Sequence, residues 1–139
     1  MQITVIDDDT SFRESLKSLI RSAGFETEGF ASADAFLNSG SLNRSHCLIV
    51  DLRMPGISGL ELQRRLNQLF RSVPIVFVSA YVNEETRKRA LDAGAVDFLY
   101  KPFSDQRLMK AIEAALRRGD RSGAAPFGVL VPGERPLTD

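Results

Sequence analysis

The sequence predicts an α/β fold in which helices cover both faces of a parallel β-sheet. Two patterns favour this fold class. Short apolar runs without polar alternation, at residues 3–6, 47–50 and 75–78, are typical of strands that are buried on both faces. Apolar residues at helical spacing lie between them. This alternation of strands and helices indicates a doubly wound domain.

The helical repeats have apolar residues at intervals of three and four, so that each helix carries one apolar stripe. Three stripes are clear, formed by Phe12, Leu16, Leu19 and Ile20, by Leu62, Leu66, Leu69 and Phe70, and by Leu108, Ile112, Ala115 and Leu116. Strands are expected at residues 2–6, 26–30, 47–50, 75–78 and 96–100, and helices at residues 10–23, 33–39, 59–70, 84–93 and 105–117.

Local signals mark several helix ends. The pairs Ser11–Glu14 and Ser58–Glu61 have the spacing of a capping box and predict helix starts. Gly24 and Gly94 stand where helices are expected to stop, because glycine readily adopts the left-handed conformation that ends many helices.

The composition limits the function. Lysine plus arginine and aspartate plus glutamate both count 18, so no net charge draws the chain to nucleic acid or to an anionic membrane. We therefore expect no direct nucleic-acid contact. The single cysteine, Cys47, excludes an internal disulfide and is expected to be a buried hydrophobe. No apolar run approaches the roughly 20 residues of a membrane span, and no signal peptide is visible. A soluble cytoplasmic protein is expected.

The sequence divides into one domain and a short extension. Residues 1–118 carry the periodic patterns and are long enough for one core. Residues 119–139 contain four glycines and three prolines without periodicity, and are predicted to be a flexible tail or linker. Within them, Phe127–Val131 is apolar enough to dock against another surface.

Acidic and basic residues follow the expected strands. Asp7 to Asp9, Asp51, Ser79 and Lys101 come after strands whose carboxyl ends meet at one edge of a parallel sheet, where ligands bind. Several carboxylates crowded together repel one another. A hard divalent cation such as Mg²⁺ would relieve this repulsion, and a lysine nearby could bind a phosphoryl oxygen. The edge therefore predicts a site for a cation and a phosphoryl group.

Simpler interpretations of these residues stay open. Asp9 suits the N-cap of the following helix. Asp51 could be no more than a polar end to its strand, and Lys101 could form a structural ion pair with Asp51. Ser79 could serve only a turn.

The order and spacing of four motifs match a known family. They are Val5–Asp9, Leu48–Gly56, Val78–Ala80 and Gly94–Phe103. Over about residues 2–117 the sequence resembles the receiver domain of two-component response regulators, most like receivers that are attached to helix-turn-helix DNA-binding domains. The resemblance implies a flavodoxin-like five-stranded sheet in the order 2-1-3-4-5, flanked by five helices.

The resemblance also implies a role for each site residue. Asp51 would accept a phosphoryl group from a histidine kinase or a phosphotransfer protein. Asp8, Asp51 and the backbone carbonyl of Arg53 would bind Mg²⁺, and Asp7 would act on it through water. Lys101 would hold a phosphoryl oxygen, aimed by a cis peptide bond to the proline that follows. Asp9 is left to helix capping.

Two further residues are implied to form a switch. Ser79 would move to bind the phosphoryl group, and Phe98 would then turn inward, although a fixed core position is the simpler interpretation of Phe98. This movement would couple the site to the surface made by residues 84–93, 96–100 and 105–117, where such domains dimerise or meet partners. Arg53 and Tyr81 flank the entrance, where we expect them to control how fast water reaches the acyl phosphate.

The main alternative is a Mg²⁺-dependent phosphohydrolase of the haloacid dehalogenase type, which also uses an aspartyl nucleophile. Such enzymes carry a second aspartate two places after the nucleophile, and this chain has Arg53. We therefore expect a phosphoacceptor switch rather than an enzyme. Dinucleotide binding is disfavoured, since the first strand leads into three aspartates instead of a glycine-rich turn. No recognition-helix pattern follows residue 118. Both a stand-alone receiver and part of a longer transcriptional regulator remain open.

Overall fold

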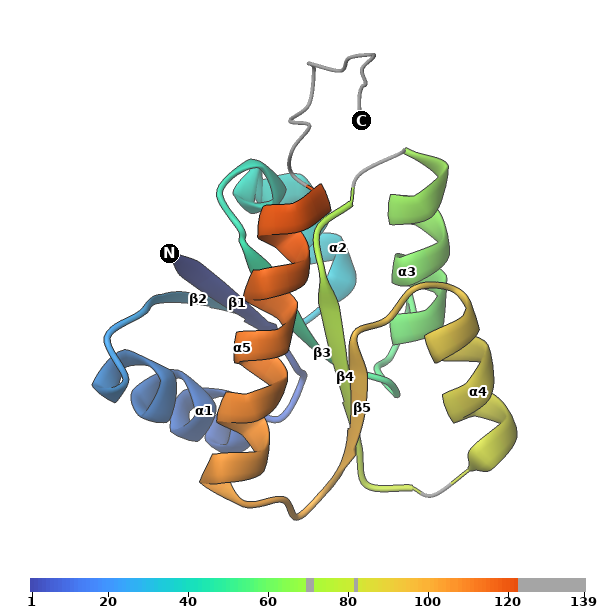
Figure 1. Cartoon of the computed structure of the whole chain (residues 1–139). Coiled ribbons are helices and arrows are strands. Elements are labelled where there is room, and N and C mark those ends of the chain that lie inside the picture. Colours follow the sequence, from blue (N-terminus) through green and yellow to red (C-terminus); the bar gives the residue numbers. More distant parts are fainter. Residues whose placement is uncertain (70–71, 82, 123–139) are drawn as a thin grey trace.

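The computed structural model, which describes residues 1–69, 72–81 and 83–122, is a parallel sheet covered by helices (Figure 1). The strands are β1 (Gln2–Ile6), β2 (Glu26–Phe30), β3 (Cys47–Asp51), β4 (Ile75–Ser79) and β5 (Asp97–Tyr100). The helices are α1 (Thr10–Ser22), α2 (Ala33–Ser39), the short 3₁₀ helix η1 (Ser41–Asn43), α3 (Gly59–Gln68), α4 (Glu84–Asp92) and α5 (Asp105–Ser122). The strand order is β2-β1-β3-β4-β5, and all pairs are parallel. The predicted fold class is confirmed.

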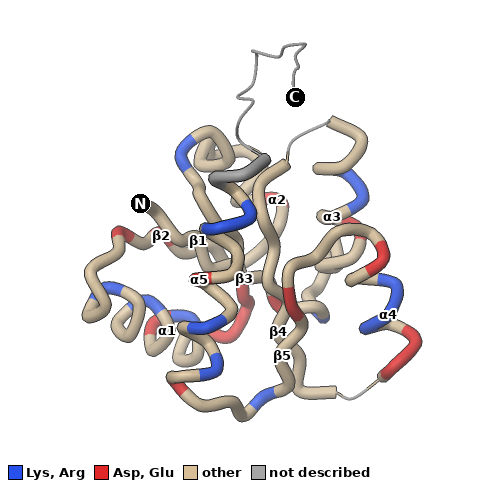
Figure 2. Tube along the Cα trace, viewed as in Figure 1, with Lys and Arg blue, Asp and Glu red and all other residues tan. Residues whose placement is uncertain are grey.

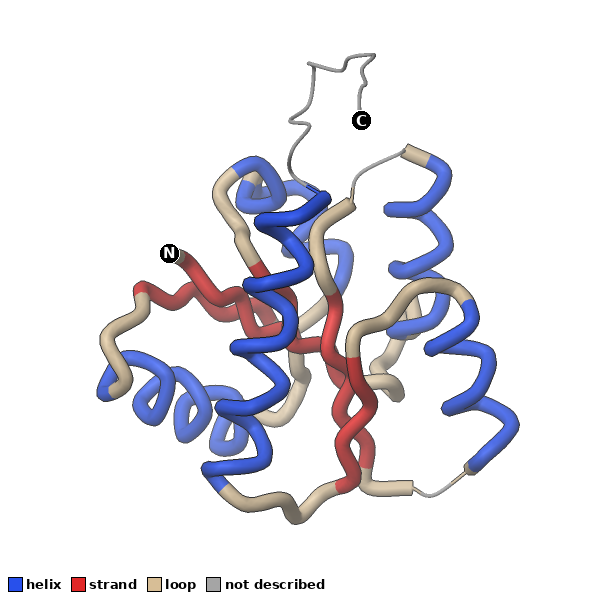
Figure 3. The backbone as a smooth tube through the Cα atoms, in the orientation of Figure 1, coloured by secondary structure: helices blue, strands red, loops and turns tan. Residues whose placement is uncertain are grey.

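The helices form one layer on each face of the sheet (Figures 1 and 3). Phe77 of β4 packs with buried residues of α2, α3 and α4, whereas its neighbours Val76 and Val78 pack with those of α1 and α5. Successive strand residues point to opposite faces. Because both faces are covered, each strand needs apolar side chains on both sides, and this explains the unbroken apolar runs.

Helix starts follow the expected capping chemistry with one exception. The Ser58 hydroxyl accepts from the Glu61 backbone N–H at 3.1 Å and caps α3. The N-cap of α1 is Asp9, whose carboxylate accepts from the Phe12 N–H at 3.1 Å. The predicted Ser11–Glu14 capping box is wrong, because the helix begins at Thr10 and Ser11 already lies inside its first turn.

Helix ends agree less well with the sequence. Gly24 and Gly94 follow α1 and α4 with positive φ values of 99° and 111°, as predicted. Helix α5 instead runs to Ser122, past the predicted end at residue 117 and the predicted domain boundary at 118. Gly119 is tolerated within the helix at a cost of about 1 kcal/mol relative to alanine, at a point where an added Cβ would lie 3.4 Å from Pro74. The apolar segment at residues 127–131 lies outside the described residues.

Two apolar positions show where burial was predicted correctly and where it was not. Cys47 is fully buried, and burial raises the pKa of its thiol to about 12, so the thiol stays protonated and unreactive. Leu69, predicted on the buried stripe of α3, is 58% exposed, because the helix ends at Gln68 and Leu69 is only its C-cap residue. Residue 70 lies outside the described residues. Within the described ranges, no helix has the length and hydropathy to cross a membrane.

Candidate functional site

The ends of four strands bring the predicted site residues to one edge of the sheet. Asp51 and Ser79 are the last residues of β3 and β4, while Asp7 and Lys101 directly follow β1 and β5. The parallel registers place these ends side by side, with Asp51 opposite Val78. Figure 2 shows acidic positions gathered between α1 and β3. The expected convergence is therefore present.

Three carboxylates form a cluster at this edge. One carboxylate oxygen from each of Asp7, Asp8 and Asp51 lies within 4.8 Å of the other two. Asp7 is 1% exposed and Asp51 8% exposed, whereas Asp8 reaches solvent. Oxygen ligands of this kind suit Mg²⁺, which keeps several waters and needs few carboxylates. The residues present therefore fit a hard divalent cation.

The electrostatics of the cluster act most clearly on Asp51. Burial, followed by the charge of Asp7, raises the pKa of its carboxyl group from 3.8 to about 6, and the charge of Asp8 adds to this rise. The Lys101 ammonium and a hydrogen bond from the Arg53 backbone oppose it. That bond is long, with Arg53 N 3.4 Å from Asp51 Oδ1. A cation in the cluster would favour the ionised form of Asp51.

Lys101 lies beside Asp7 rather than Asp51. Its Nζ is 3.2 Å from Asp7 Oδ2 and 3.9 Å from the centre of the Phe12 ring. The interpretation of Lys101 as an ion-pair partner of Asp51 is thus wrong in this conformation. The Asp9 N–H binds Asp7 Oδ1 at 2.9 Å and leaves Oδ2 for the ammonium. The peptide bond that follows Lys101 is cis, as the resemblance implied.

Ser79 serves a turn in this conformation. Its hydroxyl accepts from the Tyr81 N–H at 3.0 Å and lies 3.2 Å from the Tyr81 carbonyl, to which it donates. The simpler interpretation of Ser79 therefore describes the structure. Its movement toward a phosphoryl group stays a prediction.

Arg53 and Tyr81, both predicted to flank the entrance of the site, contact each other. The Arg53 guanidinium carbon lies 4.3 Å from the centre of the Tyr81 ring, a cation–π contact. The ring is otherwise open to solvent, with Tyr81 59% exposed. The contact joins the loop that follows β3 to the loop that follows β4. Asp51 and Ser79 are the last strand residues before these two loops.

Phe98 is buried on the α4 side of the sheet. It is 4% exposed, and its ring centre lies 6.2 Å from that of Phe77 and 5.4 Å from that of Tyr100. The Tyr100 hydroxyl donates to Glu84 at 3.1 Å. A core position, the simpler interpretation of Phe98, therefore describes this conformation. A change of its position on phosphorylation stays a prediction.

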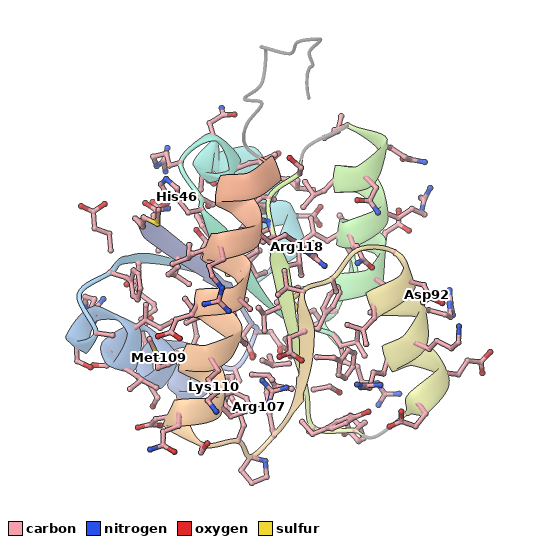
Figure 4. The ribbon with its side chains drawn as sticks, viewed as in Figure 1. His46, Asp92, Arg107, Met109, Lys110 and Arg118 are labelled. Atoms are coloured by element: carbon pink, nitrogen blue, oxygen red, sulfur yellow. The ribbon has the colours of Figure 1, made fainter. Side chains whose placement is uncertain are left out.

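The neighbouring surface of α4, β5 and α5 carries charges of both signs. Arg107, labelled on α5 in Figure 4, binds the Asp97 carboxylate of β5 through two hydrogen bonds of 2.7 and 2.9 Å. Acidic and basic positions also follow one another along α4 (Figure 2). Such a surface favours a partner whose charges are complementary rather than a purely apolar partner.

Sequence reasoning missed one residue at the site. The Arg13 guanidinium Nη1 donates to the backbone carbonyl of Asp7 at 2.7 Å. The available signal was its position in the first turns of α1, close after the strand end, but an arginine there is equally consistent with a solvated helix face.

The fold and the site together define an α/β domain with a cluster of three carboxylates, which fits a hard divalent cation, at the carboxyl edge of its sheet. Residues 3–113 match the family model of the response regulator receiver domain. The chain therefore belongs to the response regulator receiver domains of two-component systems, as the motifs had indicated. This membership does not favour the phosphohydrolase alternative.

Similar proteins agree with this family. The response regulator protein TodT of Pseudomonas putida is 45% identical over 115 residues, which are 83% of this chain and 51% of the relative. The transcriptional regulatory protein FixJ of Bradyrhizobium diazoefficiens is 41% identical, with 99% of this chain and 71% of the relative covered. Solved structures of the response regulator StyR and of FixJ-N superpose with TM-scores of 0.83 and 0.76 at 44% and 35% identity. They cover 89% and 84% of this chain, and 63% and 93% of the other chains.

The chain spans about half the length of several curated relatives that it matches, among them TodT.

Proposed function

We propose that Asp51 accepts a phosphoryl group from a histidine kinase or a phosphotransfer protein. The observation that carries this proposal is the cluster of Asp7, Asp8 and Asp51, whose carboxylate oxygens lie within 4.8 Å beside the Lys101 ammonium. An Asp51 oxygen forms the new bond to phosphorus while the bond from phosphorus to the donor's imidazole nitrogen breaks. The product is an acyl phosphate.

The acidic residues hold the cation that this transfer needs. Asp8, Asp51 and the backbone carbonyl of Arg53 would bind Mg²⁺ directly, and Asp7 would act through water. The cation held there would supply positive charge to offset the charge on the phosphoryl oxygens. A bound cation would favour the ionised form of Asp51, because it would offset the burial and the charge repulsion that raise the pKa of this carboxyl group.

Phosphorylation then changes the contacts around the site. The new group adds a charge between roughly −1.5 and −2 and three acceptor oxygens. Lys101 exchanges Asp7 for one of these oxygens, and Ser79 exchanges Tyr81 for another. The rearrangement reaches Phe98 and alters the surface of α4, β5 and α5, through which the domain dimerises or binds its partner.

The chain acts as a switch in the cytoplasm and regulates transcription through a protein partner or an attached output domain, without touching nucleic acid itself. Its own chemistry is limited to phosphorylation from small donors and to loss of the phosphate. Arg53 stands where a phosphohydrolase of the alternative type would need an acid, which supports this limit.

Our first prediction tests the acceptor. With Mg²⁺ and a small phosphodonor, the wild-type protein should gain one acid-labile phosphate, measured as a mass increase of the intact protein. Asp51→Asn should gain none, whereas Asp92→Asn, which changes an exposed carboxylate of α4, should label as the wild type does. Equal labelling of the wild type and Asp51→Asn would contradict the assignment.

A further inference from the structure

Hydrogen bonds hold the backbone, the side chain and the carbonyl group of Asp7 in place. Asp7 donates its N–H to the Phe30 carbonyl at 3.0 Å, and its two carboxylate oxygens are bound by the Asp9 N–H and by Lys101. Its carbonyl oxygen accepts from Arg13 at 2.7 Å. Because a peptide group is planar, fixing this carbonyl also fixes the direction in which the chain enters Asp8.

Asp8 is exposed to solvent, whereas Asp7 is buried. Yet the Asp8 carboxylate has to face Asp7 and Asp51 to complete the cluster. An exposed side chain has several rotamers of similar energy. The orientation of its backbone therefore affects how often the carboxylate points into the cluster, and the Arg13 guanidinium binds the carbonyl oxygen of the peptide group that leads into Asp8.

The Arg13 side chain lies against Gly29 of β2, a position without a side chain, where it reaches the Asp7 carbonyl. On β2, a Cβ added to Gly29 would lie 2.8 Å from Lys17 Cδ, and 3.1 and 3.2 Å from Arg13 Cδ and Cγ. Glycine weakens a strand interior and often marks the close approach of another group. Here it lets the stems of Arg13 and Lys17 lie directly on the strand.

The head of Arg13 is also anchored on its helix side. Its Nη2 lies 3.4 Å from the Thr10 hydroxyl, and its Nε lies 3.9 Å from the Glu14 carboxylate. With its side chain only 14% exposed, the guanidinium has little freedom to leave the Asp7 carbonyl. Its planar, rigid donors suit such fixed contacts better than an ammonium would.

We propose that Arg13, seated over Gly29, is a positioning residue of the metal site: it holds the Asp7–Asp8 peptide so that the Asp8 carboxylate faces Asp51. The inference rests on the proposed function, since it concerns the binding of Mg²⁺ there. Supporting residues behind a metal ligand typically change metal affinity by about 10- to 100-fold when they are lost. Neither Arg13 nor Gly29 would touch the cation.

Gly29→Ala is the sharpest test, because it leaves every charge unchanged. Its added methyl group would lie 2.8 Å from Lys17 Cδ and 3.1 Å from Arg13 Cδ, so both side chains have to shift. The shift of Arg13 should raise the Kd for Mg²⁺, measured by calorimetry, by up to about 10-fold. Arg13→Lys keeps the charge and should raise the Kd similarly. Since both changes act through one contact, Gly29→Ala should have little further effect in the Arg13→Lys background.

Two controls separate positioning from other effects. Lys17→Ala removes the other stem on Gly29 and one positive charge, and should not raise the Kd for Mg²⁺. In metal-free protein, amide exchange at Asp9, whose N–H binds Asp7 Oδ1, should become faster in Gly29→Ala and in Arg13→Lys, with the thermal midpoint close to that of the wild type.

The outcomes are distinct. If the wild type fails to bind Mg²⁺, the proposed function fails, and this inference with it. If the wild type binds and both variants keep its Kd within twofold, Arg13 has no positioning role. A lower thermal midpoint with an unchanged Kd would show a structural role only, and additive effects in the double variant would overturn the link between Gly29 and Arg13.

Discussion

Asp51 is held in an environment that opposes its own ionisation. The residue is 8% exposed, and burial together with the charges of Asp7 and Asp8 raises the pKa of its carboxyl group to about 6. The folded domain therefore binds a proton more tightly here than the unfolded chain does. A cation bound at the cluster would offset these effects, so that it would stabilise the fold and favour the ionised form of Asp51 at the same time.

This conflict predicts how stability depends on pH. Between the ordinary pKa of 3.8 and the raised value of about 6, the folded state holds more protons than the unfolded state, so the free energy of unfolding falls as pH rises. Below this pH window, ionisation of Asp51 does not lower the free energy of unfolding, and above the window it lowers that free energy by its full amount. In chelator, Asp51→Asn should therefore exceed wild-type stability by on the order of 1 kcal/mol at pH 7, allowing for solvent at the pocket mouth, with the gain lost near pH 4.

Urea denaturation at pH 4 and pH 7 would measure the difference. Asp92→Asn, which affects an exposed pair with Lys88, should show no comparable gain. A gain for Asp51→Asn that is equal at both pH values would show that the pKa shift is not its cause.

The contact between Arg53 and Tyr81 gives a second prediction at the scale of residues. The two side chains meet 4.3 Å apart above the loops that carry the acceptor site, and should slow the entry of water to the acyl phosphate. Arg53→Asn and Tyr81→Ala should each raise the dephosphorylation rate several-fold, because a cation–π contact of about 0.5 to 1 kcal/mol is lost. Decay of the phosphorylated mass measures it, and rates equal to wild type would refute a gating role.

Among the elements, α1 is preceded by three successive aspartates that serve two different purposes. Asp7 and Asp8 face the cluster, while Asp9 turns back to cap the helix. This division follows from geometry, since only the residue just before the first helical turn can reach its free N–H groups. The same helix then presents Arg13 to the site.

The cap can be tested with neighbouring substitutions. Asp9→Ala should lower the free energy of unfolding by about 1 kcal/mol, because the Phe12 N–H loses its acceptor. Ser11→Ala, inside the first turn, should change it by less than about 0.5 kcal/mol. Chemical denaturation of both variants decides whether Asp9 or Ser11 caps the helix. A larger loss for Ser11→Ala would restore the capping box that the sequence suggested.

At the scale of the whole molecule, the sheet connects the site to a distant surface. Lys101 follows β5, and the same strand carries the buried Phe98 and, through Asp97, a pair with Arg107 of α5. A change at the strand end can therefore reach the packing between α4 and α5. Dense packing transmits such shifts because it leaves few voids to absorb them.

Lys101→Ala should separate phosphorylation from this response. The variant should still accept phosphate on Asp51, since the acidic cluster is intact, but the phosphorylated form should fail to dimerise or to bind its partner. Sedimentation velocity before and after phosphorylation would measure the association. Lys17→Ala, a lysine of α1 that pairs with Glu14, is the matched control. The coupling role is contradicted if phosphorylated Lys101→Ala associates as tightly as phosphorylated wild type.

The fold class and the set of residues at the carboxyl edge of the sheet could be predicted from the sequence, as could the strand order through the family motifs. Strands buried on both faces must be apolar throughout, and parallel topology must bring their carboxyl ends together. Asp51, Ser79 and Lys101 could therefore be placed before any coordinates. The capping role of Asp9 followed in the same way from local geometry.

Only the tertiary structure decided which side chains meet. Lys101 pairs with Asp7 because the Asp9 N–H occupies the other oxygen of Asp7, and Arg13 reaches the Asp7 carbonyl because Gly29 leaves room. Likewise α5 continues past the position where its sequence suggested an end. Periodicity records which face a residue occupies, whereas partners are chosen by competition among donors, acceptors and space that residues distant in sequence create together.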